Sequence, residues 1–296
     1  MGATEWMLLV MLSVLWGGSF FFSKVALQEL PTLTVVLLRV GIAACALALY
    51  LKATGLAFPT STSVWLAFAG MGVLNNLIPF SLLVWGQTSI ASGLASILNA
   101  MTPVFSLVIA HFLTTDEKMT PNKLAGIGFG IAGVAVLIGH DAISGMSRSL
   151  LGMVACLGAA LSYGFAGVFG RRFRTMGIAP TVGAFGQVTA TTCLMLPLVL
   201  AVDAPWTLPA PSATTSAALL GLGLLSTAVA YVLFFRILAI GGATNASLVT
   251  LLIPVSAILL GSLVLGERLA PRQFLGMALI AIGLLAIDGR LLKRPE

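Results

Sequence analysis

Charged residues are scarce in this chain of 296 residues: they make up 8% of it, whereas hydrophobic residues make up 59%. An ordinary soluble domain is roughly a quarter charged, because charged side chains cover its surface. The scarcity therefore excludes a water-soluble globular protein. The net charge of +6 does not indicate nucleic acid binding either, because most basic residues lie in the loops between long apolar segments, and mainly in the loops on one side.

The sequence also lacks the motifs of the common cofactor and metal sites. Its three cysteines form no C-x-x-C pair, and neither histidine has a metal-ligand partner at useful spacing. A P-loop is absent, which excludes ATP hydrolysis by that device. An intramembrane enzyme would need a buried carboxylate pair, an H-E-x-x-H motif or a serine beside a base, and none occurs at diagnostic spacing. We expect no metal, no cofactor and no enzymatic activity.

One glycine-rich stretch, GIGFGIAG at 126–133, contains a literal G-x-G-x-x-G. A dinucleotide site needs a strand before this motif, whereas these glycines lie in the middle of an apolar window. They predict a small-residue packing face. Gly276 and Gly283 recur at equivalent positions of the last window, so we expect these two segments to pack closely, within or between subunits.

Long apolar runs dominate what is present. Windows of about 20 apolar residues occur ten times, at 6–28, 33–51, 64–86, 91–114, 122–139, 150–170, 181–202, 213–235, 243–265 and 272–288. None alternates as a β-barrel strand does, so we predict an all-α membrane protein with ten transmembrane helices. Ten basic residues on one side against four on the other place both termini in the cytoplasm. The expected location is a bacterial cytoplasmic (inner) membrane.

The chain also repeats itself. Residues 66–113 align without a gap with 217–264, and residues 117–133 align with 267–283. We therefore predict two five-helix units, residues 1–143 and 144–296. Because five is odd, the second unit crosses the membrane in the opposite sense, as in the inverted repeats of many secondary transporters. A central cavity between the two units follows from this arrangement.

These units carry WGG at 16–18, LLRVGIAACALAL at 37–49, and Pro254 followed by GERLAPRQFLGMALIAIG at 266–283. With these motifs the chain resembles the EamA-type transporters of the drug/metabolite transporter superfamily, and most of all the bacterial aromatic amino-acid exporters. The resemblance implies an exporter of small metabolites. It also implies a cavity lined mainly by helices 1 to 4 and 6 to 9, with helices 5 and 10 peripheral.

Polar side chains recur at similar depth in the third, fourth, eighth and ninth windows. An unpaired amide facing lipid would cost several kcal/mol there, so these groups face protein or water. They are either helix-to-helix bonds or the lining of a wet, substrate-binding cavity, and the lining residues would include Asn75, Asn76, Asn99, Thr227 and Thr250.

Three prolines accompany these polar groups. A proline cannot donate to the carbonyl four residues before it, so we expect free carbonyls at Asn75, Asn99 and Thr250. Bending at the prolines would let the two units rock about a central site. The expected hinges are Pro79, Pro103 and Pro254.

Aromatic side chains and one arginine complete the candidate substrate-binding set. Trp16, Phe80, Tyr163 and Tyr231 would stack on a flat apolar group. For Phe20, Phe21 and Phe22, which cannot all face inward, packing or lipid contact is the alternative. Arg39 lies below the outer end of helix 2, where it would bind either a substrate carboxylate or helix-end carbonyls. Lys24, in the last turn of helix 1, is expected to reach the outer surface.

All nine acidic residues fall in loops or at window ends. Without a carboxylate relay at mid-membrane, tightly coupled proton pumping loses its usual carrier. We therefore predict a facilitator or exchanger that works by alternating access on small metabolites, with amino acids, including aromatic ones, as the expected substrates. A proton-coupled drug or metabolite exporter of the same fold is the alternative. A channel or a structural assembly protein also remains open, and the oligomeric state is not determined by the sequence.

Overall fold

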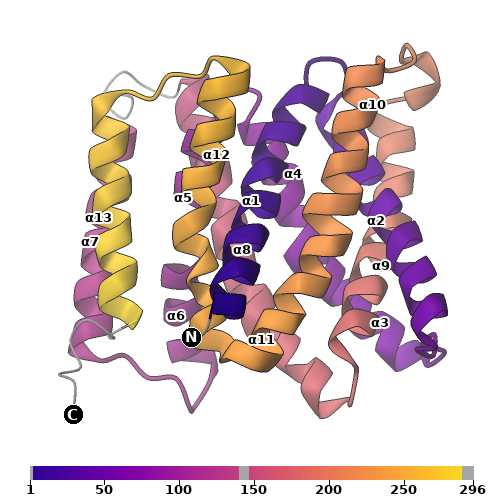
Figure 1. Cartoon of the computed structure of the whole chain (residues 1–296), viewed down its shortest axis with the longest axis horizontal. Helices are drawn as coiled ribbons and strands as arrows, with labels where there is room; N and C mark the ends of the chain where they lie inside the picture. The colour runs from indigo at the N-terminus through magenta and orange to yellow at the C-terminus, as the bar shows by residue number, and fades with distance from the viewer. Residues whose placement is uncertain (1–2, 140–146, 289–296) are drawn as a thin grey trace.

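The structure is a computed structural model that describes residues 3–139 and 147–288 (Figure 1). Eight helices are long and apolar enough to cross a membrane, and two shorter apolar helices, Val249–Leu265 and Pro271–Ile287, complete the set. These helices coincide with the ten apolar windows, and the described residues contain no strand. The predictions of an all-α class and of ten helices are confirmed.

Several of the ten crossings are divided into shorter elements. The first five crossings are α1 (Ala3–Ala26); α2 (Thr32–Thr54); α3 (Thr62–Gly72), η1 (Val73–Leu77) and α4 (Ile78–Gly86); α5 (Ser92–Asn99) and α6 (Thr102–Leu113); and α7 (Pro121–Ile138). The other five are α8 (Arg148–Thr175); α9 (Pro180–Val202); α10 (Ala213–Leu220), η4 (Gly221–Val229) and α11 (Ala230–Ser247); α12 (Val249–Leu265); and α13 (Pro271–Asp288). A short 3₁₀ turn, η3 (Pro205–Thr207), follows α9.

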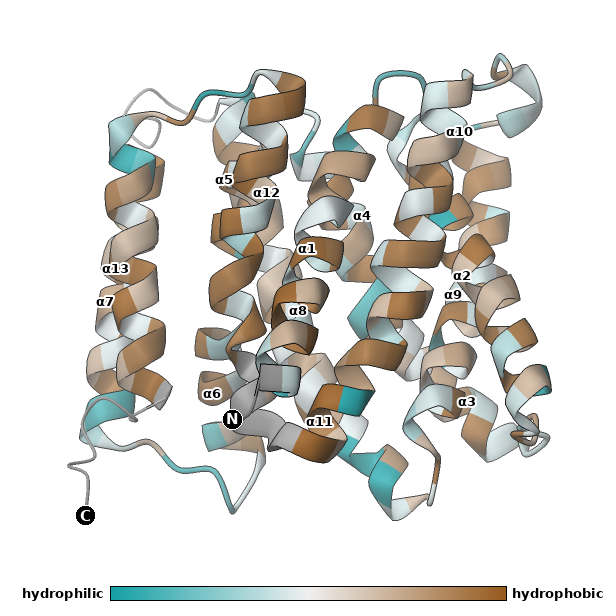
Figure 2. Ribbon diagram, in the orientation of Figure 1, coloured by the Kyte–Doolittle hydropathy of each residue, from teal (hydrophilic) through white to brown (hydrophobic). Residues whose placement is uncertain are grey.

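The distribution of polarity fits a lipid environment. Hydrophilic residues gather in the loops at the two ends of the bundle, and hydrophobic residues cover the helices between them (Figure 2). Large apolar side chains such as Leu263 and Phe112 are 81% and 77% exposed, as expected of groups that face lipid. The chain is a multi-pass membrane protein. Because five crossings precede it, α8 begins at the opposite end of the bundle from α1.

The α7/α13 pair stands at one side of the bundle and packs mainly on itself (Figure 1). A Cβ on Gly126 would lie 2.5 Å from the carbonyl oxygen of Gly283, and one on Gly133 would lie 2.8 Å from that of Gly276. The glycines therefore let the two backbones approach closely. The predicted small-residue packing face is confirmed, and the fifth and tenth crossings, α7 and α13, are peripheral.

Carboxylates at one end of the bundle join the two five-helix sets by accepting hydrogen bonds at helix N-termini. Asp203 accepts from Thr34 N at 2.8 Å and from Thr34 Oγ1 at 2.7 Å. Glu267 accepts from Ser92 N at 3.0 Å and Ser92 Oγ at 2.6 Å. In each pair the carboxylate belongs to the second set and the capped helix to the first.

A third cap runs in the reverse direction, from the first set to the second. Glu29 accepts from Ser212 N at 2.7 Å and from Ser212 Oγ at 2.6 Å. These hydrogen bonds hold the pKa of Glu29 below its usual value. The contribution of this cap to stability is therefore complete above the ordinary pKa of glutamate. It disappears as the pH falls through the lowered pKa of Glu29 in the folded protein.

Lys24 does not simply reach into solvent as the sequence predicts. Its Nζ donates to the carbonyl oxygens of Gln87 at 2.6 Å and Ile90 at 3.0 Å. Both carbonyls lie in the turn between α4 and α5, where the helix has no donors of its own to offer them. The lysine therefore stabilises a helix end, and it joins α1 to the third crossing.

We predict that Gly133→Val lowers stability because its side chain would overlap the backbone of α13. Overpacking of this kind costs about 1–3 kcal/mol, which should appear as a lower melting temperature of the purified protein in detergent. Gly128→Val is the matched control, since a Cβ at Gly128 meets nothing within 4 Å. Equal melting temperatures for the two variants would contradict the proposed packing of α7 on α13.

Candidate substrate-binding site

The third crossing changes its helical register where the two adjacent amides lie. η1 is a π-helix, in which each N–H bonds to the carbonyl five residues back rather than four, and it ends just before Pro79. In that register the carbonyl left without a donor is that of Leu74. That Pro79 also frees the Asn75 carbonyl stays a prediction. Ser162 Oγ of α8 donates to Leu74 O at 2.7 Å and satisfies it.

The second five-helix set contains the same device at the aligned positions. η4 is also a π-helix, and Thr227 Oγ1 donates to the carbonyl of Leu222, five residues back, at 2.8 Å. No proline interrupts this crossing, so the unusual register does not depend on Pro79. π segments of this kind are frequent at functional sites.

The two amides form a hydrogen-bonded network with α9 and α11. Asn75 Nδ2 donates to Gln187 Oε1 at 2.8 Å and to the hydroxyl oxygen of Tyr231 at 3.2 Å. Tyr231 in turn donates to Asn76 Oδ1 at 2.9 Å, and Asn76 Nδ2 donates to Thr191 Oγ1 at 3.3 Å. Asn76 is fully buried, so its amide bonds helix to helix in this conformation.

Arg39 of α2 lies beside this network and is 5% exposed. Its Nε donates to Thr227 Oγ1 at 3.0 Å, and its guanidinium carbon lies 3.6 Å from the centroid of the Phe80 ring. Within residues 3–139 and 147–288, Arg39 makes no salt bridge with a carboxylate.

The site around Arg39 thus draws on both five-helix sets. We call Arg39, Phe80, Thr227 and Tyr231 the central cluster. Phe80 and Tyr231 occupy aligned positions of the two repeats, and both are buried. Tyr163, half-buried on α8, packs against both hydrophobic cores of the bundle, at the seam between them. The structure therefore brings together most of the predicted aromatic residues.

Other predicted residues lie outside the central cluster. Trp16 packs on Phe234, with 5.3 Å between ring centroids. Asn99 ends α5, and its carbonyl oxygen accepts from Thr102 Oγ1 at 2.7 Å, as its position before Pro103 predicts. Its Oδ1 is buried without a hydrogen-bond partner among the described residues. Such an orphaned acceptor is suited to a substrate donor or a water molecule.

The predicted hinges occupy three different settings. Pro79 lies in the first turn of α4, directly after the π segment, and Pro103 lies in the first turn of α6, directly after the break at residues 100–101. Pro254 lies inside the continuous helix α12, where it is buried. Thr250, four residues before Pro254, is half-buried near the start of that helix.

Sequence analysis missed two members of the amide network, Gln187 and Thr191. Both lie on α9, one turn apart, and they are 3% and 0% exposed. Thr191 Oγ1 donates to the carbonyl of Gln187 at 2.7 Å. The signal was available, because a glutamine and a threonine at i and i+4 in the middle of an apolar window form a polar stripe on one helix face.

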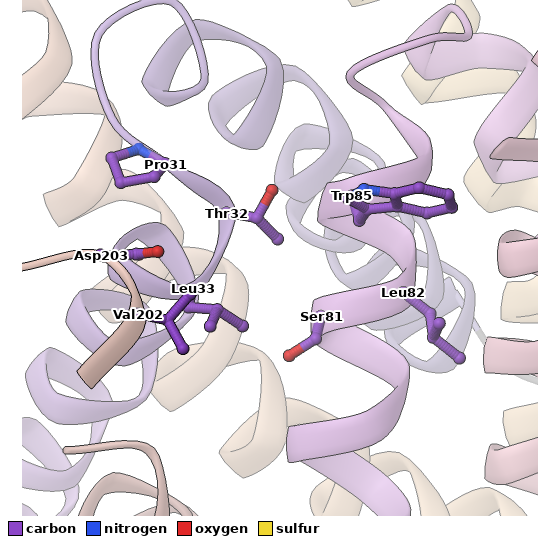
Figure 3. A pocket seen from close by; sticks show the side chains of 8 residues that line it. All are labelled: Pro31, Thr32, Leu33, Ser81, Leu82, Trp85, Val202 and Asp203. Atoms are coloured by element: carbon purple, nitrogen blue, oxygen red, sulfur yellow. The ribbon is translucent and has the colours of Figure 1, made fainter. Parts of the chain in front are cut away.

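The two ends of the bundle differ on either side of the central cluster. At the end where α2 begins, a cavity of about 430 Å³ opens between α2, α4 and the end of α9 (Figure 3). At the opposite end, aromatic rings from α3, α8, α9 and the loop before α3 contact one another edge to face, with centroids 5.3 to 6.4 Å apart. We call these rings the aromatic plug: Phe58, Trp65, Phe68, Phe173 and Phe185.

The plug packs at high density. A Cβ on Gly186 would lie 2.2 Å from the ring of Phe68, which is itself fully buried. The glycine at position 186 of α9 therefore leaves room for the Phe68 ring of α3. In this conformation α3 and α9 pack closely at one end of the bundle, and the cavity between α2 and α4 lies at the other end.

The described residues offer no site for a metal ion. Among residues 3–139 and 147–288, no group of three His, Cys, Asp or Glu side chains could hold one. The chemistry that the central cluster offers is instead that of a hydrogen-bonding, cationic and aromatic surface.

The chain matches the EamA-like transporter family twice, over residues 4–139 and 150–287. It is 29% identical to the uncharacterized transporter YoaV of Bacillus subtilis (strain 168), over 93% of this chain and 94% of that protein. It is 27% identical to a probable amino-acid metabolite efflux pump of Escherichia coli (strain K12), over 96% of this chain and 94% of that protein.

A solved crystal structure shares the fold, with a TM-score of 0.67 and 19% sequence identity over the whole of both chains. The two family matches each cover one set of five helices, and together they span nearly all of the described residues. The chain belongs to the EamA-like transporter family.

Proposed function

We propose that this transporter exports small metabolites that carry a carboxylate and an apolar part, with amino acids, including aromatic ones, as the first candidates. The observation that carries the proposal is Arg39, a buried guanidinium without a carboxylate partner in the described part of the chain. A similar protein is named a probable amino-acid metabolite efflux pump. The direction of transport, outward, follows from that similarity.

An uncompensated buried charge is unfavourable, and among the described residues one side-chain hydrogen bond and one aromatic ring offset the charge of Arg39. A substrate carboxylate would supply a charge-assisted, two-pronged partner for the guanidinium. The rings of Tyr231 and Phe235 lie stacked, with 6.3 Å between centroids, and would contact a flat apolar group. The polar network of Asn75 and Gln187 provides further donors and acceptors.

Arg39→Ala is expected to weaken binding of an aromatic amino acid at least about tenfold, because hydrogen bonds to charged groups contribute about 1.5–3 kcal/mol each. Binding is measured from the substrate-dependent rise in melting temperature of the purified protein. The control ligand is the methyl ester of the same amino acid, which lacks the carboxylate and should be affected little. If Arg39→Ala weakens both ligands equally, the arginine only holds α2 against η4.

Acidic residues do not enter the central cluster, which supports a facilitator or exchanger. Glu29, Asp203 and Glu267 cap helices at one end of the bundle. Asp116 and Glu117 form exposed salt bridges with Arg171. We predict that proteoliposomes preloaded with substrate take up labelled substrate by counter-exchange without a proton gradient. A protonophore should leave the rate unchanged. Strict dependence on an imposed proton gradient would favour the proton-coupled alternative.

Saturable counter-exchange also separates a carrier from a channel or a structural protein, since only a carrier binds and reorients with each molecule. The mechanism we propose is alternating access, in which the two five-helix sets rock about the central cluster. With both termini in the cytoplasm of a bacterial inner membrane, the cavity between α2 and α4 faces outward. The aromatic plug then closes the cytoplasmic side.

Pro254→Ala is expected to slow transport several-fold while protein level changes little, because the alanine restores a backbone hydrogen bond and stiffens α12. Initial rates in proteoliposomes, divided by the amount of protein, measure the effect. Pro197→Ala is the matched control: Pro197 also lies inside a helix, α9, but is exposed. Equal effects of the two substitutions would show that Pro254 does not act as a hinge.

A further inference from the structure

The cavity between α2, α4 and α9 combines apolar walls with hydrogen-bond acceptors (Figure 3). Its volume is about 430 Å³, which is large enough for a small metabolite. No basic side chain lines it. Its lining residues are Pro31, Thr32, Leu33, Ser81, Leu82, Trp85, Val202 and Asp203.

Asp203 has unused capacity to accept hydrogen bonds. Both of its hydrogen bonds, from Thr34 N and Thr34 Oγ1, go to the same oxygen, Oδ2. In the described part of the chain, Oδ1 accepts none. Across the cavity, Ser81 Oγ is buried and has no hydrogen-bond partner either. Figure 3 shows the Ser81 hydroxyl directed from α4 into the space between α2 and α4, and it shows Asp203 beside Val202 at the start of α2.

These groups suit a ligand that donates hydrogen bonds and carries positive charge. A carboxylate forms strong, charge-assisted hydrogen bonds with an ammonium group. Trp85, which is 45% exposed, lines the cavity from α4, and an indole attracts cations with its ring face and contacts apolar groups. An anion would be repelled by Asp203, with no basic side chain to offset the repulsion.

The cavity lies next to the central cluster along the same two helices. Arg39 follows Thr34 by five residues on α2, about 7.5 Å along the helix axis. Ser81 directly follows Phe80, whose ring centroid lies 3.6 Å from the guanidinium carbon of Arg39. A molecule that moves between α2 and α4 would therefore meet Asp203 and Arg39 in succession.

We propose that this cavity is a second binding site, for the ammonium group of a primary amine with an apolar substituent, and that Asp203 is its recognition residue. The inference rests on the proposed function only for the identity of the substrate: amino acids would be held by their ammonium group here and by their carboxylate at Arg39. The two sites would thus select zwitterions over simple acids and simple amines.

The test uses phenethylamine, an amine without a carboxylate, and purified full-length protein. Phenethylamine should raise the melting temperature of the wild-type protein and of Arg39→Ala, and it should quench tryptophan fluorescence. Asp203→Asn should bind phenethylamine at least about tenfold more weakly, because the amide keeps an acceptor for Thr34 but loses the charge. Glu29→Gln is the matched control, since Glu29 caps another helix at the same end and does not line the cavity.

A second variant keeps the proposal testable if Asp203→Asn does not fold. Trp85→Leu removes the exposed indole, which makes no hydrogen bond in the described structure, and should also weaken phenethylamine binding several-fold. No binding to the wild-type protein, or equal binding to wild type, Asp203→Asn and Trp85→Leu, would overturn the second site. Failure of carboxylate binding at Arg39 leaves this amine assay unaffected, so the two proposals fail separately.

Discussion

A polar group within the hydrocarbon of a membrane has no water to bond with, and this constraint governs the interior of the bundle. The π register at η1 moves the orphan carbonyl to Leu74, and Ser162 of the neighbouring helix supplies its donor. Asn75 and Asn76 are likewise bonded to α9 and α11. Arg39 departs furthest from this pattern, since a charged group with five donors has one side-chain hydrogen bond and one aromatic ring among the described residues. The central proposal follows from that departure.

The two five-helix sets meet this constraint in different ways at aligned positions. The first set uses an amide pair followed by Pro79, whereas the second uses Ser226 and Thr227 in a helix without proline. Ser226 Oγ is buried without a partner in the described chain, while the aligned Asn75 makes two hydrogen bonds. The repeats are therefore similar in backbone and different in chemistry, so a substrate would meet an asymmetric surface.

Much of the fold could be predicted from composition alone, because lipid imposes long apolar runs and the small-residue contacts between them. The ten helices and the glycine face of α7 follow from such local patterns. The site could be predicted only in part. That Asn75, Phe80 and Tyr231 lie together follows from their depth and alignment, but the partners Gln187 and Thr191 depend on how α9 packs, which no local pattern gives. The π segment before Pro79 was not predicted from the sequence either.

The most direct test of the account is the accessibility of position 75. Asn75→Cys is made in a chain whose native cysteines are replaced, and a membrane-impermeant thiol reagent is applied to either face of sealed vesicles. The account predicts modification from one face at a time, with added substrate changing the rate. Modification from neither face would contradict a water-accessible central site that opens to alternate sides.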